Sequence, residues 1–98
     1  MIRLSDEAER QLAALIRHYT QIGRPEAKRN LIAAIDGAVD RIERDPAGGL
    51  PAPRPYPDLA RPGRAWIKVG RYWIAYSTTQ PPVVVGVFFD TANIPRRI

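Results

Sequence analysis

Residues 65–89 read AWIKVGRYWIAYSTTQPPVVVGVFF, and this stretch decides the fold. Gly70 and Arg71 separate two runs rich in β-branched and aromatic residues, and they fit a two-residue hairpin turn with glycine first. The last run, VVVGVFF, is apolar without a break, which is typical of a central strand covered on both faces. We therefore predict strands at residues 65–69, 72–78 and 83–89.

The segment before these strands, residues 46–63, contains six of the ten prolines and three of the seven glycines. This composition sustains neither a helix nor a strand ladder, so the segment is predicted to be a long loop. A linker between two domains is rejected, because in a chain of 98 residues neither side is large enough to bury an adequate core. We expect one domain over residues 1–98.

Farther toward the N-terminus, two amphipathic helices are predicted. Ser5 offers a side-chain cap to the first helix, and Gly23 is its expected end. Pro25 suits the first turn of the second helix, which Pro46 terminates. The apolar residues form one stripe on each helix: Ala8, Leu12, Leu15, Ile16, Tyr19 and Ile22 on the first, and Ala27, Leu31, Ile35, Ala38 and Ile42 on the second. The short connection requires an antiparallel hairpin.

Residues 1–4 alternate in polarity and are predicted to form a short edge strand. The element order is then β-α-α-β-β-β, an α+β fold in which the helix hairpin packs on one face of a small antiparallel sheet. The other sheet face is expected to stay partly open. The strand aromatics supply more surface than two helices cover from one side, so these rings either form a partner site or complete a thin core. They are Trp66, Tyr72, Trp73 and Tyr76.

Charge is distributed unevenly along the sequence. The net charge is +5, yet residues 1–49 are neutral and residues 50–98 hold seven basic and two acidic side chains. This surplus favours an acidic partner, such as nucleic acid or another polyanion. Cysteine is absent, and charged residues near the N-terminus leave no apolar stretch long enough for a signal peptide or a membrane span. We expect a soluble cytoplasmic protein without membrane association.

Most catalytic and metal-binding patterns are missing from the sequence. The only serines are Ser5 and Ser77 and the only histidine is His18, which disfavours a nucleophilic triad and a zinc site. No glycine-rich stretch matches a nucleotide-binding fingerprint. We therefore expect no cofactor and no metal.

Basic residues around the predicted hairpin are the remaining candidates for chemistry. They are Arg61, Arg64, Lys68 and Arg71. Arg64, Trp66 and Lys68 share one strand face if the strand begins at residue 64. Such a cluster can grip phosphates while the ring stacks a base. The alternative is a strand edge that positive charge keeps soluble.

In element order and in several segments, the sequence resembles the ParE/RelE superfamily of toxins from bacterial type II toxin–antitoxin modules. These segments are SDEAERQLAALIRHY at 5–19, RIERDP at 41–46, RYWIAY at 71–76, VVVGVFF at 83–89 and DTANIPRRI at 90–98. The resemblance implies a toxin that forms a hetero-oligomer with a cognate antitoxin, a small DNA-binding protein whose acidic, disordered tail folds along the helix hairpin and the sheet. The candidate antitoxin contacts are Leu12, Leu15, Tyr19, Leu31, Ile35, Trp66 and Trp73.

Two branches of this superfamily imply different functions. RelE-like members are ribosome-dependent mRNA endonucleases, whereas ParE-like members poison DNA gyrase without hydrolysing anything. RelE-like enzymes typically place a Tyr or His near the end of the last strand, where this sequence has Phe88, Phe89 and Asp90. We therefore predict a ParE-like gyrase poison with no catalytic residue; the alternatives are an mRNA endonuclease and a family member that has lost toxicity. The candidate target contacts are Arg61, Arg64, Lys68, Arg71, Arg96 and Arg97.

Overall fold

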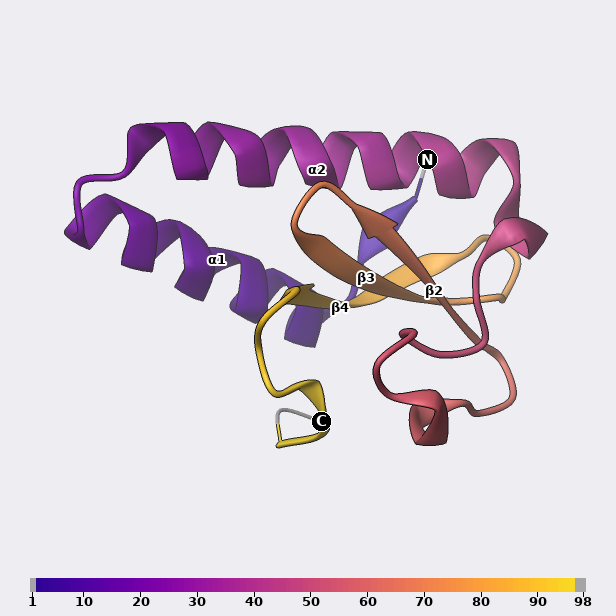
Figure 1. Ribbon diagram of the computed structural model, residues 1–98. Coiled ribbons are helices and arrows are strands. Elements are labelled where there is room, and N and C mark those ends of the chain that lie inside the picture. The colour runs from indigo at the N-terminus through magenta and orange to yellow at the C-terminus, as the bar shows by residue number, and fades with distance from the viewer. Residues whose placement is uncertain (1, 97–98) are drawn as a thin grey trace.

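Two helices pack against a four-stranded sheet in the computed structural model, which describes residues 2–96 (Figure 1). The helices are α1 (Asp6–Gln21) and α2 (Pro25–Arg44), and the strands are β1 (Arg3–Leu4), β2 (Arg64–Val69), β3 (Tyr72–Ser77) and β4 (Val83–Phe89). Short 3-10 helices are η1 (Pro46–Gly48), η2 (Pro57–Leu59) and η3 (Ile94–Arg96). The predicted α+β class and the order β-α-α-β-β-β are confirmed.

Local chemistry at the helix ends explains where the hairpin begins and turns. The Ser5 hydroxyl accepts a hydrogen bond from the Ala8 backbone N–H at 3.1 Å, and acidic residues occupy the first turn of α1. Gly23 follows α1 with a φ of +66°, a conformation that favours glycine. Pro25 is the first residue of α2. The predicted helix limits are confirmed to within about two residues, and the helices run antiparallel (Figure 1).

The sheet has the strand order β1-β4-β3-β2, so β4 is a central strand as predicted. The β2–β3 and β3–β4 pairs are antiparallel, and Val69 faces Tyr72 across the turn that Gly70 begins with a φ of +59°. β1 pairs with β4 in parallel, so the sheet is mixed and the prediction of a purely antiparallel sheet was wrong. No tight turn joins β1 to β4, and the pair is therefore not constrained to the antiparallel direction.

The first core lies between the helix hairpin and the sheet. The buried residues of α2 are Leu31, Ala34, Ile35, Ala38 and Ile42, whereas α1 buries only Ala8. The other apolar residues of α1 that pack against this core are half-buried. Consequently α1 keeps accessible apolar surface along its length.

A second core covers the opposite face of the sheet. Its buried residues are Trp66, Trp73, Ala75, Phe88 and Ile94, with Leu50, Tyr56, Leu59 and Val85 packed against them. The cover comes from the loop at residues 46–63 and from η3. The prediction that this sheet face stays partly open was therefore wrong. The alternative, in which the tryptophan rings complete a thin core, is correct. Leu50 and Trp66 exchange two backbone hydrogen bonds of 2.7 Å, which fix the loop to β2. Proline suits such a cover, because it restricts the unfolded loop and lowers the entropy lost on folding.

Candidate functional site

A hollow of about 930 Å³ lies between α1 and the end of β4. Leu15, Tyr19 and Ile22 line it from the side of α1, and Val87 and Phe89 line it from β4. Ile22 caps the C-terminus of α1 and is 51% exposed. A concave site with accessible apolar side chains is the usual form of a partner-binding surface.

A neighbouring hollow of about 580 Å³ lies between the start of α2 and the β2–β3 turn. Tyr19, Arg24 and Phe89 line both hollows, so the two form one continuous surface that we call the apolar groove. Within residues 2–96, Arg24 makes no ion pair with an acidic side chain. Glu26 lines the second hollow as well, so the groove combines apolar surface with charged groups of both signs.

Two tyrosines connect α1 to β3 in this groove. The hydroxyl oxygens of Tyr19 and Tyr72 are 2.6 Å apart and share a hydrogen bond. Burial and, after it, the bond to Tyr19 raise the pKa of Tyr72 well above its ordinary value. Tyr72 is therefore neutral at physiological pH, and because it is only 3% exposed it acts as a structural contact.

Two of the predicted target contacts are engaged within the molecule. Arg71 donates hydrogen bonds of 2.9 and 3.3 Å to the Asp90 carboxylate, and the Lys68 ammonium lies 3.6 Å from it. The hydrogen bond from Arg71 is the main cause that holds the pKa of Asp90 below its usual range. The Arg71 guanidinium also lies 5.1 Å from the centre of the Phe89 ring. The sequence analysis missed this role of Asp90, although Asp90 is one of only two acids in residues 50–98.

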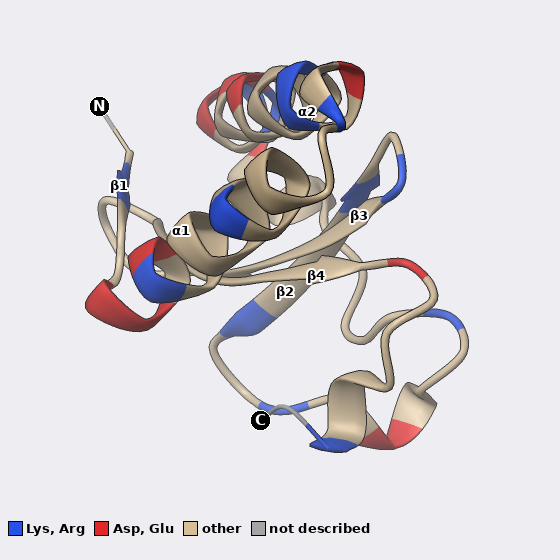
Figure 2. Cartoon of the chain, turned by 90° about the vertical axis from the view of Figure 1, so that its left-hand side faces the viewer, with Lys and Arg blue, Asp and Glu red and all other residues tan. Residues whose placement is uncertain are grey.

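The remaining predicted target contacts lie elsewhere on the molecule. Arg64 begins β2, where burial and the nearby Arg61 lower its pKa. Arg61 and Arg96 are exposed, and Arg97 lies outside the described residues. Figure 2 shows Lys and Arg on both helices, on strands and in loops. The structure does not bring the predicted basic residues together into one site.

The predicted antitoxin contacts divide into two groups. Three of them keep accessible surface: Leu12, Leu15 and Tyr19. The other four are buried in the two cores: Leu31, Ile35, Trp66 and Trp73. A buried side chain cannot contact a partner in this conformation, so the structure contradicts the prediction that these four residues bind the antitoxin. The prediction that a nucleic-acid base stacks on Trp66 is wrong for the same reason, because this ring is 0% exposed.

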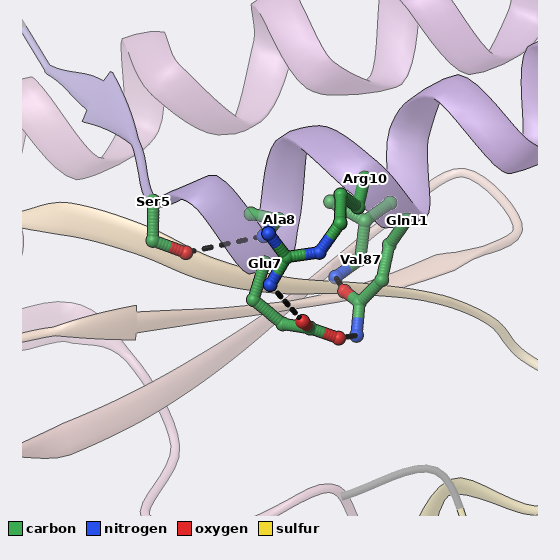
Figure 3. Close-up of polar contacts among 6 residues, drawn as sticks. All are labelled: Ser5, Glu7, Ala8, Arg10, Gln11 and Val87. Atoms are coloured by element: carbon green, nitrogen blue, oxygen red, sulfur yellow. Dashed lines mark hydrogen bonds and ion pairs between the residues drawn. The ribbon is translucent and has the colours of Figure 1, made fainter.

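A polar contact between α1 and β4 was also missed by the sequence analysis. The Gln11 Oε1 accepts a hydrogen bond of 2.8 Å from the Val87 backbone N–H (Figure 3). The Gln11 amide also donates a 3.5 Å hydrogen bond to Glu7, which pairs with Arg10 at 2.6 Å. Nothing in the spacing of the sequence signals the contact, because Gln11 and Val87 lie 76 positions apart.

Two features of the described part of the chain bear on other functional classes. No group of three or more His, Asp or Glu residues that could hold a metal ion occurs in residues 2–96. No helix of this part is long and apolar enough to cross a bilayer.

Comparison with known protein families gives a match over most of the chain. The model of the family described as "ParE toxin of type II toxin-antitoxin system, parDE" matches residues 2–89. These residues include both helices and the four described strands, and they end before η3. No curated protein matches the chain.

Proposed function

The chain belongs to the ParE toxin family of type II toxin–antitoxin systems, and on this premise we propose that it arrests growth by poisoning DNA gyrase until a cognate antitoxin neutralises it. The observation that carries the choice of gyrase over RNA is the end of β4. There Phe88, Phe89 and Asp90 stand where RelE-like enzymes typically have a Tyr or His.

The charges near this strand end also support binding rather than hydrolysis. Cleavage of RNA through a 2′-hydroxyl needs a base, an acid and cations that stabilise the phosphorane. Asp90 accepts hydrogen bonds from Arg71 and pairs with Lys68, which lowers the pKa of its carboxyl and makes Asp90 a weak base. Phe88 is buried in the second core and offers no proton.

The apolar groove supports the antitoxin part of the proposal. Leu15, Tyr19 and Ile22 present an apolar surface onto which an amphipathic segment can lay its own apolar face. Arg24 at the groove and the net charge of +5 complement an acidic tail. Because gyrase acts on the chromosome, the proposal also places the protein in the cytoplasm.

Two measurements test this proposal. Expression of the chain without the protein encoded by the adjoining reading frame is expected to arrest growth, and co-expression of both is expected to restore it. The purified chain is expected to stabilise cleaved DNA in a reaction with gyrase. Messenger RNA cut between codons on the ribosome would favour the endonuclease instead. Normal growth at confirmed expression would indicate a family member that has lost toxicity.

A further inference from the structure

The cover of the second core carries arginines that have no acidic partner. Four arginines of the loop, of β2 and of η3 make no ion pair within residues 2–96: Arg54, Arg61, Arg64 and Arg96. Arg64 is half-buried and the other three are exposed. The only acid in residues 46–64 and 91–96 is Asp58. The cover therefore has a clear excess of positive charge.

Contacts with the second core place these arginines on one side of the molecule. The Arg54 guanidinium lies 5.4 Å from the centre of the Trp73 ring. Arg64 lines a hollow of about 410 Å³ together with Trp66, and Arg96 belongs to η3, which is anchored in the same core. Figure 2 shows basic segments of the loop, of the start of β2 and of η3 below the sheet, opposite the helices. The positive charge is thus carried by a packed surface.

Arg61 and Arg64 are close enough to repel each other. The Arg64 N–H donates a hydrogen bond of 3.4 Å to the Arg61 carbonyl, and burial and then the charge of Arg61 lower the pKa of Arg64. A guanidinium stays charged at neutral pH despite such a shift. Two like charges held together without a carboxylate between them destabilise the isolated chain, and a bound anion relieves this repulsion.

We propose that this surface, which consists of Arg54, Arg61, Arg64 and Arg96 and which we call the arginine face, binds the phosphate backbone of duplex DNA. The inference rests on the proposed function and deepens it, because it assigns to the chain a contact with the DNA on which gyrase acts. Arginine suits this ligand, since its planar guanidinium donates two parallel hydrogen bonds to phosphate oxygens.

The burial of the aromatic rings favours duplex DNA over single-stranded RNA. Single strands are bound largely by stacking of their bases on accessible aromatic rings. On this side of the sheet Trp66 is 0% exposed and Trp73 is 3% exposed, so neither ring is available for stacking. A duplex presents its phosphates without requiring contacts to its bases. We therefore expect the binding to be independent of the DNA sequence.

Fluorescence anisotropy with a short labelled DNA duplex tests the inference on the full chain. Each phosphate contact adds about −0.9 to the slope of the logarithm of affinity against the logarithm of salt concentration. The double variant Arg61→Gln/Arg64→Gln is expected to bind about tenfold more weakly, with a slope shallower by about two. Its matched control is Arg17→Gln/Arg29→Gln, which removes the same charge from exposed positions of α1 and α2. The control should bind the duplex as the unmodified chain does.

A charge change of the opposite sign keeps the test independent of the folding of the double variant. Asp58→Asn removes the only acid of the cover and is expected to tighten DNA binding about twofold. Asp36→Asn is the control, because Asp36 is exposed on α2 and makes no ion pair within residues 2–96. Equal effects of these two substitutions would assign the binding to net charge and overturn the inference.

The remaining outcomes separate the inference from the proposed function. A chain that stabilises cleaved DNA with gyrase but does not bind the duplex at low salt overturns the inference and leaves the proposed function intact. Binding to the duplex without any effect on gyrase supports the arginine face and counts against the proposed function. Tighter binding of single-stranded RNA than of the duplex overturns the choice of DNA. If the double variant loses affinity for the antitoxin and keeps its affinity for DNA, the arginine face binds the antitoxin and the inference is wrong.

Discussion

Asp90 determines what two of the basic residues around the hairpin can do. Its carboxylate accepts two hydrogen bonds from Arg71 and lies within 3.6 Å of Lys68, so three side chains tie together the ends of β2, β3 and β4. One carboxylate offsets only one of the two positive charges, but the hydrogen bonds that Arg71 donates to Asp90 leave fewer of its N–H groups for a phosphate. Arg71 and Lys68 therefore act mainly as structural contacts that connect the strand ends.

The substitution Asp90→Asn tests this role through the pH dependence of stability. The pKa of Asp90 is lowered in the folded state, so its stabilising contribution is present above the ordinary carboxyl pKa and is lost as pH falls through the lowered value. We expect Asp90→Asn to lower the melting temperature by a few degrees at neutral pH. The difference from the unmodified protein should shrink on acidification and disappear at the lowest pH. Thermal unfolding followed by circular dichroism between neutral and acid pH measures this.

Asp58→Asn is the matched control, since Asp58 is exposed in η2 and has no ion pair within residues 2–96. It should leave the melting temperature nearly unchanged at every pH. An equal loss for Asp90→Asn at neutral and acid pH would assign the effect to packing rather than to charge.

Among the elements, the Pro-rich loop and η3 have the largest structural consequence. They convert the second sheet face from an accessible surface into a core around Trp66 and Trp73. Arg54 from the loop adds a contact in which its guanidinium lies 5.4 Å from the centre of the Trp73 ring. The family match ends at residue 89, yet η3 lies beyond it and inserts Ile94 into this core. Residues 90–96 are therefore part of the folded structure.

Ile94→Ala tests the contribution of η3 to the second core. Ile94 is 0% exposed, and truncation of a buried isoleucine costs about 2–5 kcal/mol of the free energy of unfolding. Urea denaturation measures this loss. Ile32→Ala serves as the control, because Ile32 is 46% exposed on α2 and its truncation should cost about 0.5 kcal/mol or less. Similar losses for the two variants would mean that η3 does not support the core.

At the scale of the whole molecule, the two helices divide their tasks. α2 is the helix whose apolar stripe is buried, and α1 is the helix that keeps accessible surface beside β4. The apolar groove lies where α1, the start of α2 and the ends of the strands meet. This division leaves accessible apolar surface on the molecule, to which an antitoxin can bind.

Ile22→Ser tests whether the antitoxin occupies the apolar groove. Because Ile22 is 51% exposed and lines the groove, its substitution should weaken the complex about tenfold and leave the melting temperature nearly unchanged. Isothermal titration with the protein encoded by the adjoining reading frame measures the affinity. Ile32→Ser is the control, because Ile32 is 46% exposed but does not line the groove. This variant should bind the antitoxin with the affinity of the unmodified chain. Equal affinities for all three proteins would place the antitoxin on another surface.

Much of the fold could be predicted from the sequence, because it depends on short-range spacing. The cap at Ser5, the turn at Gly70 and the break at Pro46 each act on backbone within a few residues. The periods of 3.6 and two likewise distinguished the helices from the strands. The helical stripe likewise placed Leu15 and Tyr19 on one face of the first helix, and both line the apolar groove.

The amino-acid sequence by itself determined the order of the elements, their ends and the resemblance to a toxin family. Only the tertiary structure decided that the loop closes the second face, that β1 runs parallel to β4, that Asp90 engages Arg71 and Lys68, and that Gln11 reaches Val87. These contacts join residues far apart in the chain, and no local periodicity encodes them. They depend on the path of the connecting segments and on the reach of individual side chains, which are fixed only when the elements pack together.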